Sequence, residues 1–233
     1  MMVYPLERSI TLYGTSRSPF ARRVRLALLM AGIEFEWKDL ALKDLFPPST
    51  ELLGVNPLGL VPVFVDQDGF AIFDSNEILA HIDSHFIKLW PSGEPQRKRS
   101  RRLSALAQGI LTYAVREFQN LRVKSSMSDF VEDNIELIER SLKWIETDSV
   151  SLELFFWGEK EQTSQALDRS LERKLSISAP TLTQAAIDVG CALEYLDFRL
   201  SDKINWREHC PSLVQVFANI SEIQFFDETR PKL

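Results

Sequence analysis

The fold is decided by residues 58–65, LGLVPVFV, which follow the turn residues Asn56 and Pro57. The stretch is an apolar strand pattern with a proline near its start. Because proline cannot donate to a β ladder, it belongs at the first residue of a strand, at an edge or at a bulge. A peptide bond before proline can also be cis at modest cost. Taken alone, the stretch favours a turn that enters an edge strand. A cis Val61–Pro62 bond would instead turn the backbone N–H and C=O of Val61 outward, free to pair with an extended ligand.

The residues before this stretch predict a strand, a helix and a second strand. Residues 9–13 alternate and are β-branched, which is typical of a strand. Ser18 and Pro19 are typical of a helix start, and residues 21–31 carry apolar positions at helical spacing. Residues 34–38 alternate again. A strand–helix–strand unit in this order predicts a parallel pair with a right-handed crossover.

The residues after the stretch complete a compact α/β domain. The Asp-Gly pair at residues 68–69 predicts a hairpin between a strand at 61–66 and a returning strand at 70–73. A helix then runs to about residue 86, capped by Asp74 or Ser75.

After residue 86 the sequence pattern changes from alternating strands and helices to helices alone. Residues 87–95 are typical of a linker, and the segments after it have helical patterns. Apolar residues recur at helical spacing in four segments, 97–123, 129–145, 183–200 and 211–225. The third of these is expected to be the buried central helix. We therefore predict an α/β domain over residues 1–86 and an all-helical domain over residues 96–233, with a polar insertion near 158–178.

The composition is that of a globular protein. Hydrophobic residues make up 45% of the 233 residues and charged residues 26%, and the formal net charge of −6 argues against a general nucleic-acid binder. The basic cluster at residues 97–102 is expected to be a solvated helix face. There is no signal-peptide pattern and no apolar run of spanning length, so we expect a soluble cytoplasmic protein with no membrane partner.

The sequence favours neither a disulfide framework nor a metal site. The two cysteines are Cys191, in an apolar helical pattern, and Cys210, which is expected to be more exposed near a turn. His81 and His85 have metal-compatible spacing, but no third ligand is evident, so a pair on a helix surface is favoured.

Ser18 stands where the first strand leads into the first helix. A hydroxyl there lies in a field that favours negative charge. A thiol bound beside it would have its pKa lowered from about 8.5 toward neutrality, which leaves more of the nucleophilic thiolate. Taken alone, a serine at this position is more often only a helix cap. Tyr13, Thr15 and Ser16 are further candidate hydroxyl donors.

Asp74 and Ser75 open a helix directly after a strand. The backbone amides at such a helix start can hold a carboxylate, and Asp74 can accept from a ligand ammonium. In isolation, capping of the helix again explains both residues. The order of the elements would, however, bring this helix start, Ser18 and Val61 to a common edge of one sheet.

Taken together, these motifs resemble the glutathione S-transferase superfamily. The first part of the chain is similar to its thioredoxin-like domain, and the second part is similar to bacterial members. The resemblance covers nearly the whole chain apart from about 158–178, and it implies a thioredoxin-like α/β domain followed by an all-α domain. The matching segments are residues 12–14 (LYG), 18–25 (SPFARRVR), 56–63 (NPLGLVPV), 74–78 (DSNEI), 105–111 (ALAQGIL), 191–199 (CALEYLDFR) and 206–213 (WREHCPSL).

The resemblance implies glutathione as co-substrate and no metal. Glutathione would lie against the loop of Leu60, Val61 and Pro62, with its cysteinyl backbone paired to Val61. Its γ-glutamyl carboxylate would meet Asp74 and Ser75. We therefore predict a cis Val61–Pro62 bond, with the Val61 backbone facing an open groove bordered by Ser18 and Ser75.

The resemblance also implies the chemistry. The sulfur of glutathione would point at Ser18, where serine-type members place the hydroxyl that stabilises the thiolate, and serine there favours conjugation over thiol–disulfide exchange. The electrophile pocket would lie between the domains, lined by Tyr113 and Phe118. We therefore expect a homodimeric glutathione transferase that conjugates the thiolate to a small hydrophobic electrophile.

The sequence departs from the family pattern at several positions. Asp74 replaces the usual glutamate, Leu60 a residue that is often polar or basic, Ala186 a capping-box residue of the sixth helix, and Val216 a frequent tryptophan. These departures motivate a competing hypothesis, a non-catalytic binding or regulatory protein with the same fold. A third hypothesis is a glutathione-dependent lyase, isomerase or reductase, of which the reductase is disfavoured by Ser18.

Overall fold

The structure, a computed structural model, divides into two compact units. It describes residues 9–122, 134–148 and 182–231. One unit runs to Ile87 and also contains the segment that begins at Thr229, and the other is Lys88–Glu228. The sequence pattern predicts that this last segment belongs to the helical domain. It belongs to the first unit instead, where the Thr229 hydroxyl accepts a hydrogen bond from Arg22 Nε at 3.2 Å.

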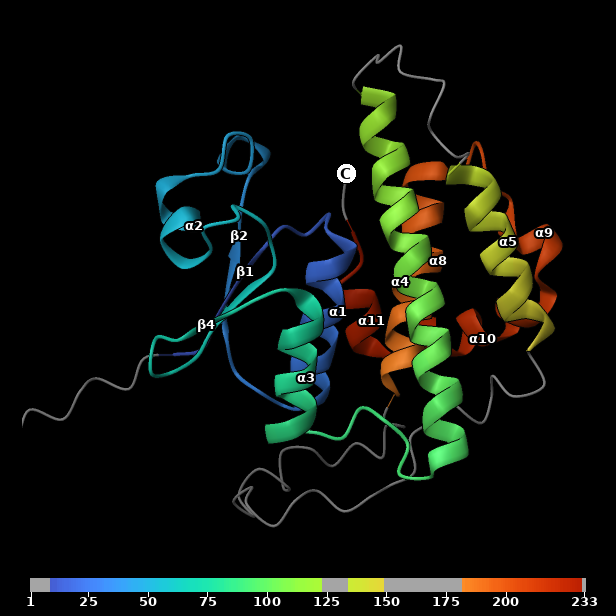
Figure 1. Ribbon diagram of the computed structural model, residues 1–233, viewed down its shortest axis with the longest axis horizontal. Helices are drawn as coiled ribbons and strands as arrows, with labels where there is room; N and C mark the ends of the chain where they lie inside the picture. The colour runs from blue at the N-terminus through green and yellow to red at the C-terminus, as the bar shows by residue number, and fades with distance from the viewer. Residues whose placement is uncertain (1–8, 123–133, 149–181, 232–233) are drawn as a thin grey trace, which may run out of the picture. The chain divides into compact units, whose positions relative to one another are not determined.

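The first unit is built on a four-stranded sheet with helices (Figure 1). Its elements are β1 (Thr11–Gly14), α1 (Pro19–Met30), β2 (Glu36–Asp39), the 3₁₀ helix η1 (Leu42–Asp44), α2 (Thr50–Val55), β3 (Val63–Val65), β4 (Ala71–Ile72) and α3 (Ser75–His85). The strand order is β2-β1-β3-β4. β1 pairs with β2 in parallel and with β3 antiparallel, and β3 pairs antiparallel with β4. The predicted parallel pair, hairpin and thioredoxin-like domain are confirmed.

β3 is not the edge strand that the proline predicted. It lies between β1 and β4, with Leu12 and Ile72 both opposite Phe64 on its two sides. Pro62 fits because the strand begins only at Val63, so the missing N–H removes no ladder hydrogen bond.

The two faces of β1 are covered differently because successive side chains of a strand point to opposite sides. Gly14 faces α1, where an added Cβ would lie 2.5 Å from the ring of Trp37 and 2.8 Å from Cβ of Ala21. Tyr13 faces the other side and packs with Leu52 of α2. Glycine is therefore needed where β1 leads into the turn before α1.

The described part of the second unit is built from helices (Figure 1), and this confirms the predicted all-α C-terminal domain. The helices are α4 (Glu94–Arg122), α5 (Asn134–Thr147), α8 (Gln184–Leu200), α9 (Trp206–His209), α10 (Pro211–Ser221) and α11 (Gln224–Glu228). α4 begins inside the predicted linker, and the helix predicted over 211–225 is divided into α10 and α11. The predicted insertion near 158–178 lies outside the described residues. None of the helices in the described segments is both long and apolar enough to cross a membrane.

α8 is the buried central helix that its apolar sequence predicted, and it packs along α4. Thr183 caps it by accepting from the N–H of Ala186 at 3.3 Å. At Ala186, where the family commonly has a polar capping-box residue, this chain has no carboxylate. The nearest one is two residues later, at Asp188. Asp188 is fully buried and accepts from Gln184 Nε2 at 2.8 Å and from the hydroxyl of Ser104 on α4. This arrangement ties α8 to α4 through buried hydrogen bonds.

Candidate functional site

Ser18 caps α1, as predicted. Its hydroxyl oxygen accepts a hydrogen bond from the N–H of Ala21 at 3.2 Å, and Pro19 occupies the first turn. The N–H of Ser18 donates to the C=O of Thr15 at 2.9 Å, which fixes the turn before the helix. Because the Ser18 oxygen acts as an acceptor in the cap, its hydroxyl hydrogen is available for a ligand.

The loop before β3 is organised by Asn56, which is 1% exposed. Its amide nitrogen donates to the C=O of Leu60 at 2.8 Å, and its amide oxygen accepts from the N–H of Leu58 at 3.0 Å. The Val61–Pro62 bond is cis, which confirms the prediction. Within the described chain, no partner meets the backbone N–H or C=O of Val61. The Leu60 side chain is exposed.

Asp74 and Ser75 open α3, as predicted. Asp74 is exposed and its carboxylate accepts from the N–H of Asn76 at 2.9 Å, whereas Ser75 is nearly buried. In the part of the chain that the structure describes, the backbone N–H groups of Ser75 and Glu77 have no acceptor. The start of α3 therefore presents backbone donors that the described residues leave unfilled, as is usual for a helix start.

A buried guanidinium joins α1 to the start of α3. Arg23 is 1% exposed, and it donates to Oγ of Ser75 and to Oδ1 of Asn76, each at 3.1 Å. α1 and α3 lie side by side (Figure 1). The bond therefore connects the helix that carries Ser18 with the helix start at Ser75.

Sequence reasoning missed both Arg23 and Asn56 as supports of the site. The signal for Arg23 was its position one turn before the buried Ala27, on the packed side of α1. Asn56 was interpreted only as a turn residue, although asparagine side chains commonly bond the backbone of their own turn.

Tyr13, one of the candidate hydroxyl donors, lies on the face of the sheet that α2 covers, and its hydroxyl bonds a neighbouring side chain. Its hydroxyl lies 3.2 Å from Lys38 Nζ, which also pairs with Glu51 at 2.7 Å. The hydrogen bonds with Glu51 and then with Tyr13 raise the pKa of Lys38. The phenol is thus part of a cluster that supports α2.

Thr15 and Ser16, which also carry candidate hydroxyls, lie in the turn between β1 and α1. The N–H of Ser16 donates to Oδ1 of Asp39 at 2.8 Å, which ties this turn to the end of β2. Both residues are close to Ser18 in the chain, but only Ser18 among the three accepts the capping bond of α1.

Tyr113 and Phe118 belong to the helical unit, whereas Ser18, Val61 and Ser75 belong to the first. Both aromatic residues lie in α4 and are partly buried. The guanidinium of Arg116 lies 5.8 Å from the ring centre of Tyr113, and that of Arg199 lies 4.3 Å from the ring centre of Phe118.

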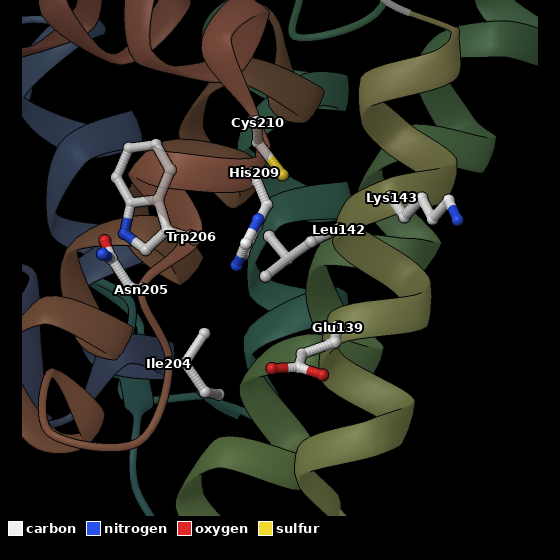
Figure 2. A pocket seen from close by; sticks show the side chains of 8 residues that line it. All are labelled: Glu139, Leu142, Lys143, Ile204, Asn205, Trp206, His209 and Cys210. Atoms are coloured by element: carbon white, nitrogen blue, oxygen red, sulfur yellow. The ribbon is translucent and has the colours of Figure 1, made fainter.

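A cavity of about 390 Å³ lies inside the helical unit, between α5 and α9 (Figure 2). Its apolar lining comes from Leu142, Ile204 and Trp206, which are 3%, 3% and 2% exposed. The carboxylate of Glu139 and the imidazole of His209 point toward the cavity (Figure 2). None of the predicted site residues lines it.

Both cysteines are buried, which corrects the expectation that Cys210 is more exposed. Cys210 directly precedes α10 and lines the cavity together with residues of α5. Burial, and then the nearby carboxylate of Glu146, raise the pKa of the Cys210 thiol to about 11. It is therefore a neutral thiol near pH 7, and a buried neutral thiol is a poor nucleophile.

His81 and His85 stack on α3 with ring centroids 4.2 Å apart. Burial, and then the charge of His85, lower the pKa of His81. Over the described segments, no group of three or more His, Cys, Asp or Glu side chains is arranged to hold a metal ion.

The sequence matches a known family over the part of the chain that contains Ser18, Val61 and Ser75. Residues 17–85 match the model for the glutathione S-transferase N-terminal domain. A GST-like protein of Escherichia coli K12, YibF, is 28% identical over 94% of this chain and 98% of its own length. Glutathione S-transferase 1 of Dianthus caryophyllus is 34% identical over 59% of this chain and 58% of its own.

Solved structures agree over nearly the whole chain. A glutathione S-transferase of Methylobacillus flagellatus with bound glutathione is 27% identical, with a TM-score of 0.76 over 96% of this chain and 100% of its own. A glutathione transferase family member of Pseudomonas fluorescens Pf-5, also with bound glutathione, is 27% identical, with a TM-score of 0.75 over 97% of this chain and 100% of its own. The motifs, the fold and these likenesses agree, and the chain belongs to the glutathione S-transferase superfamily.

Proposed function

We propose that the protein is a glutathione transferase that joins the sulfur of glutathione to a small hydrophobic electrophile. The observation that carries the proposal is the Ser18 hydroxyl at the start of α1, which caps the helix through its oxygen and retains a hydrogen to donate. Two similar proteins that align with nearly the whole chain were solved with glutathione bound.

In this proposal Ser18 stabilises the thiolate of glutathione. Its hydroxyl donates to the sulfur, and the N-terminal end of α1 adds a favourable field. The thiol proton leaves to water. The thiolate then forms a bond to the electrophilic carbon, and the leaving group departs with its bonding electron pair. The protein contributes orientation and stabilisation of the thiolate rather than a covalent intermediate.

The other predicted contacts complete the proposed ligand pose. The unpaired backbone of Val61, flanked by Leu60 and Pro62, would bond the cysteinyl backbone of glutathione. Asp74 would accept from the γ-glutamyl ammonium, and Ser75 would donate to its carboxylate. No metal takes part in this chemistry.

We assign Tyr113 and Phe118 to the electrophile. Aromatic side chains provide large apolar contact area, which suits a small hydrophobic substrate. A Tyr113→Ala variant is the matching test, because it should raise KM for the electrophile and leave the affinity for glutathione unchanged.

The test of the proposed function is a Ser18→Ala variant with a matched control. We expect kcat/KM with a generic aryl-halide electrophile to fall by roughly 10- to 100-fold, because the thiolate loses a hydrogen-bond donor. The pH at which the rate reaches half its maximum should rise. Ser49→Ala is the control, because Ser49 caps α2 by accepting from Leu52 N at the same 3.2 Å. It should cost a similar cap energy, about 1 kcal/mol, and leave turnover unchanged.

Three outcomes would change the proposal. If glutathione does not bind at millimolar concentration in calorimetry, the proposed enzymatic function is wrong. If it binds but no electrophile is turned over, the hypothesis of a non-catalytic protein is supported. If Ser18→Ala has full activity, the hydroxyl role passes to Ser16, Thr15 or Tyr13.

We also propose that the protein is a homodimer. Several large apolar side chains of the first unit are exposed between residues 42 and 60, and exposed apolar patches often mark protein interfaces. They are Leu42, Phe46, Leu53, Leu58 and Leu60. Light scattering on the purified protein tests this: a mass near 26.8 kDa would show a monomer and contradict it.

A further inference from the structure

We propose that Arg23 is a positioning residue that makes the start of α3 selective for the γ-glutamyl carboxylate of glutathione. The inference rests on the proposed function, because it concerns the same ligand. Arg23 itself does not touch the ligand in this proposal. It acts through Ser75.

The geometry places Arg23 behind Ser75. Arg23 is 1% exposed, so its guanidinium is buried where α1 packs on α3. One nitrogen donates to Oγ of Ser75 and another to Oδ1 of Asn76, each at 3.1 Å. The two bonds fix the guanidinium at both ends, as its planar fork of donors permits.

The bond from Arg23 decides what the Ser75 hydroxyl can do. A hydroxyl has one hydrogen to donate and two lone pairs to accept with. Since Arg23 can only donate, the Ser75 oxygen must accept from it, and the hydroxyl hydrogen points elsewhere. Hydrogen bonds in a chain polarise one another, so the hydroxyl becomes a stronger donor.

The same helix start holds further donors and a favourable charge. The N–H groups of Ser75 and Glu77 have no acceptor in the described chain, and the N-terminal end of α3 carries partial positive charge. A carboxylate placed here would accept from the Ser75 hydroxyl and from these amides, whereas an uncharged group would gain little from the arrangement.

The experiment compares two ligands on the full-length protein by calorimetry. One is glutathione, and the other is 4-aminobutyryl-cysteinylglycine, which is glutathione without its γ-glutamyl carboxylate. For Arg23→Met we expect glutathione to bind at least about 10-fold more weakly and the analogue to change less than about twofold. Arg23→Lys keeps the positive charge and one donor. It should therefore regain part of the preference for glutathione over the analogue that Arg23→Met loses.

The matched control is Arg22→Met. Arg22 is also buried in α1, but its Nε donates to Thr229 rather than to α3. Arg22→Met should lower the melting temperature, as Arg23→Met does. It should leave the ratio of the affinities for glutathione and for the analogue as in the wild type. Any unfolded fraction affects both ligands equally, so the ratio separates selectivity from stability.

A double-mutant cycle with Ser75→Ala tests whether Arg23 affects glutathione binding through Ser75. If Arg23 acts through Ser75, the double variant should bind glutathione no more weakly than Ser75→Ala alone. Additive losses would overturn the proposal, as would equal losses for the two ligands with Arg23→Met. If the wild type binds glutathione and Arg23→Met leaves the affinity ratio unchanged, the inference fails alone. If the wild type does not bind glutathione, it fails together with the proposed function.

Discussion

The starts of α3 and α10 differ in how their free backbone N–H groups are bonded. Each helix start has backbone N–H groups that its own helix cannot satisfy. At α10 the carboxylate of Glu146, from α5, accepts from Ser212 N–H at 2.9 Å and Leu213 N–H at 3.0 Å. At α3 the carboxylate of Asp74 accepts from one amide, that of Asn76, and the described residues offer no acceptor to the N–H groups of Ser75 and Glu77.

The comparison shows what a carboxylate does at such a place. In the helical unit, the chain supplies its own carboxylate and closes the helix start. In the first unit, it supplies a buried cation, Arg23, and leaves the position open. α10 is thus an internal example of the contact that we propose for a ligand carboxylate at α3.

The largest effect is expected at the filled helix start. Glu146→Ala should lower the free energy of unfolding by about 2 kcal/mol, because two amides lose a charged acceptor. Urea denaturation measures this. Glu139→Ala is the control, since Glu139 lies exposed on the same helix, and it should change the stability by less than about 0.5 kcal/mol. Glutathione affinity should be unchanged in both, and a loss of affinity in Glu146→Ala would remove the distinction between a structural and a ligand-binding helix start.

A smaller effect is expected at the open helix start. Asparagine caps helices about as well as aspartate, so Asp74→Asn should change the stability by less than about 0.5 kcal/mol. The variant should nevertheless bind glutathione roughly 3- to 10-fold more weakly, because the ligand ammonium loses a charged acceptor. Glutaryl-cysteinylglycine, which lacks this ammonium, should bind both forms alike. Should the stability fall and the affinity stay constant, Asp74 would be a cap only.

The smallest effect concerns the far half of α3 and its response to pH. The folded-state pKa of His81 is lowered by burial and by His85, and the nearby carboxylate of Asp66 partly opposes this. Since the unfolded chain takes up the proton first, stability should be constant well above pH 6.5 and fall as the pH drops through 6.5. It should level off below the folded-state pKa. His81→Gln should remove this part of the pH dependence in urea melts at pH 7.5, 6.5 and 5.5; an unchanged slope would contradict the assignment.

Much of the first unit could be predicted because its signals are local. Ser18 and Pro19 mark the start of α1, and the Asp-Gly pair marks the hairpin between β3 and β4. The alternation of β1 and the proline at Pro62 likewise act through neighbours in the chain. The family pattern then linked these separate signals into one site.

The errors arose where the partner lies far away in the sequence. Pro62 suggested an edge strand, but β4 covers the outer side of β3. Cys210 was expected near the surface because it precedes a proline, but packing of the helical unit buries it to 2% exposure. In both cases the local pattern was consistent with two environments, and packing selected one.

The sequence by itself determined the order of elements, the caps of α1 and α3, the cis Val61–Pro62 bond and the family, because each depends on the chemistry of adjacent residues. Only the tertiary structure decided that Arg23 reaches Ser75, 52 positions away, and that Glu146 reaches Ser212, 66 positions away. A buried charge must find its hydrogen-bond partners wherever packing brings them. For that reason the start of α10 is filled by a carboxylate of the protein, whereas at the start of α3 the described residues leave two backbone donors without an acceptor.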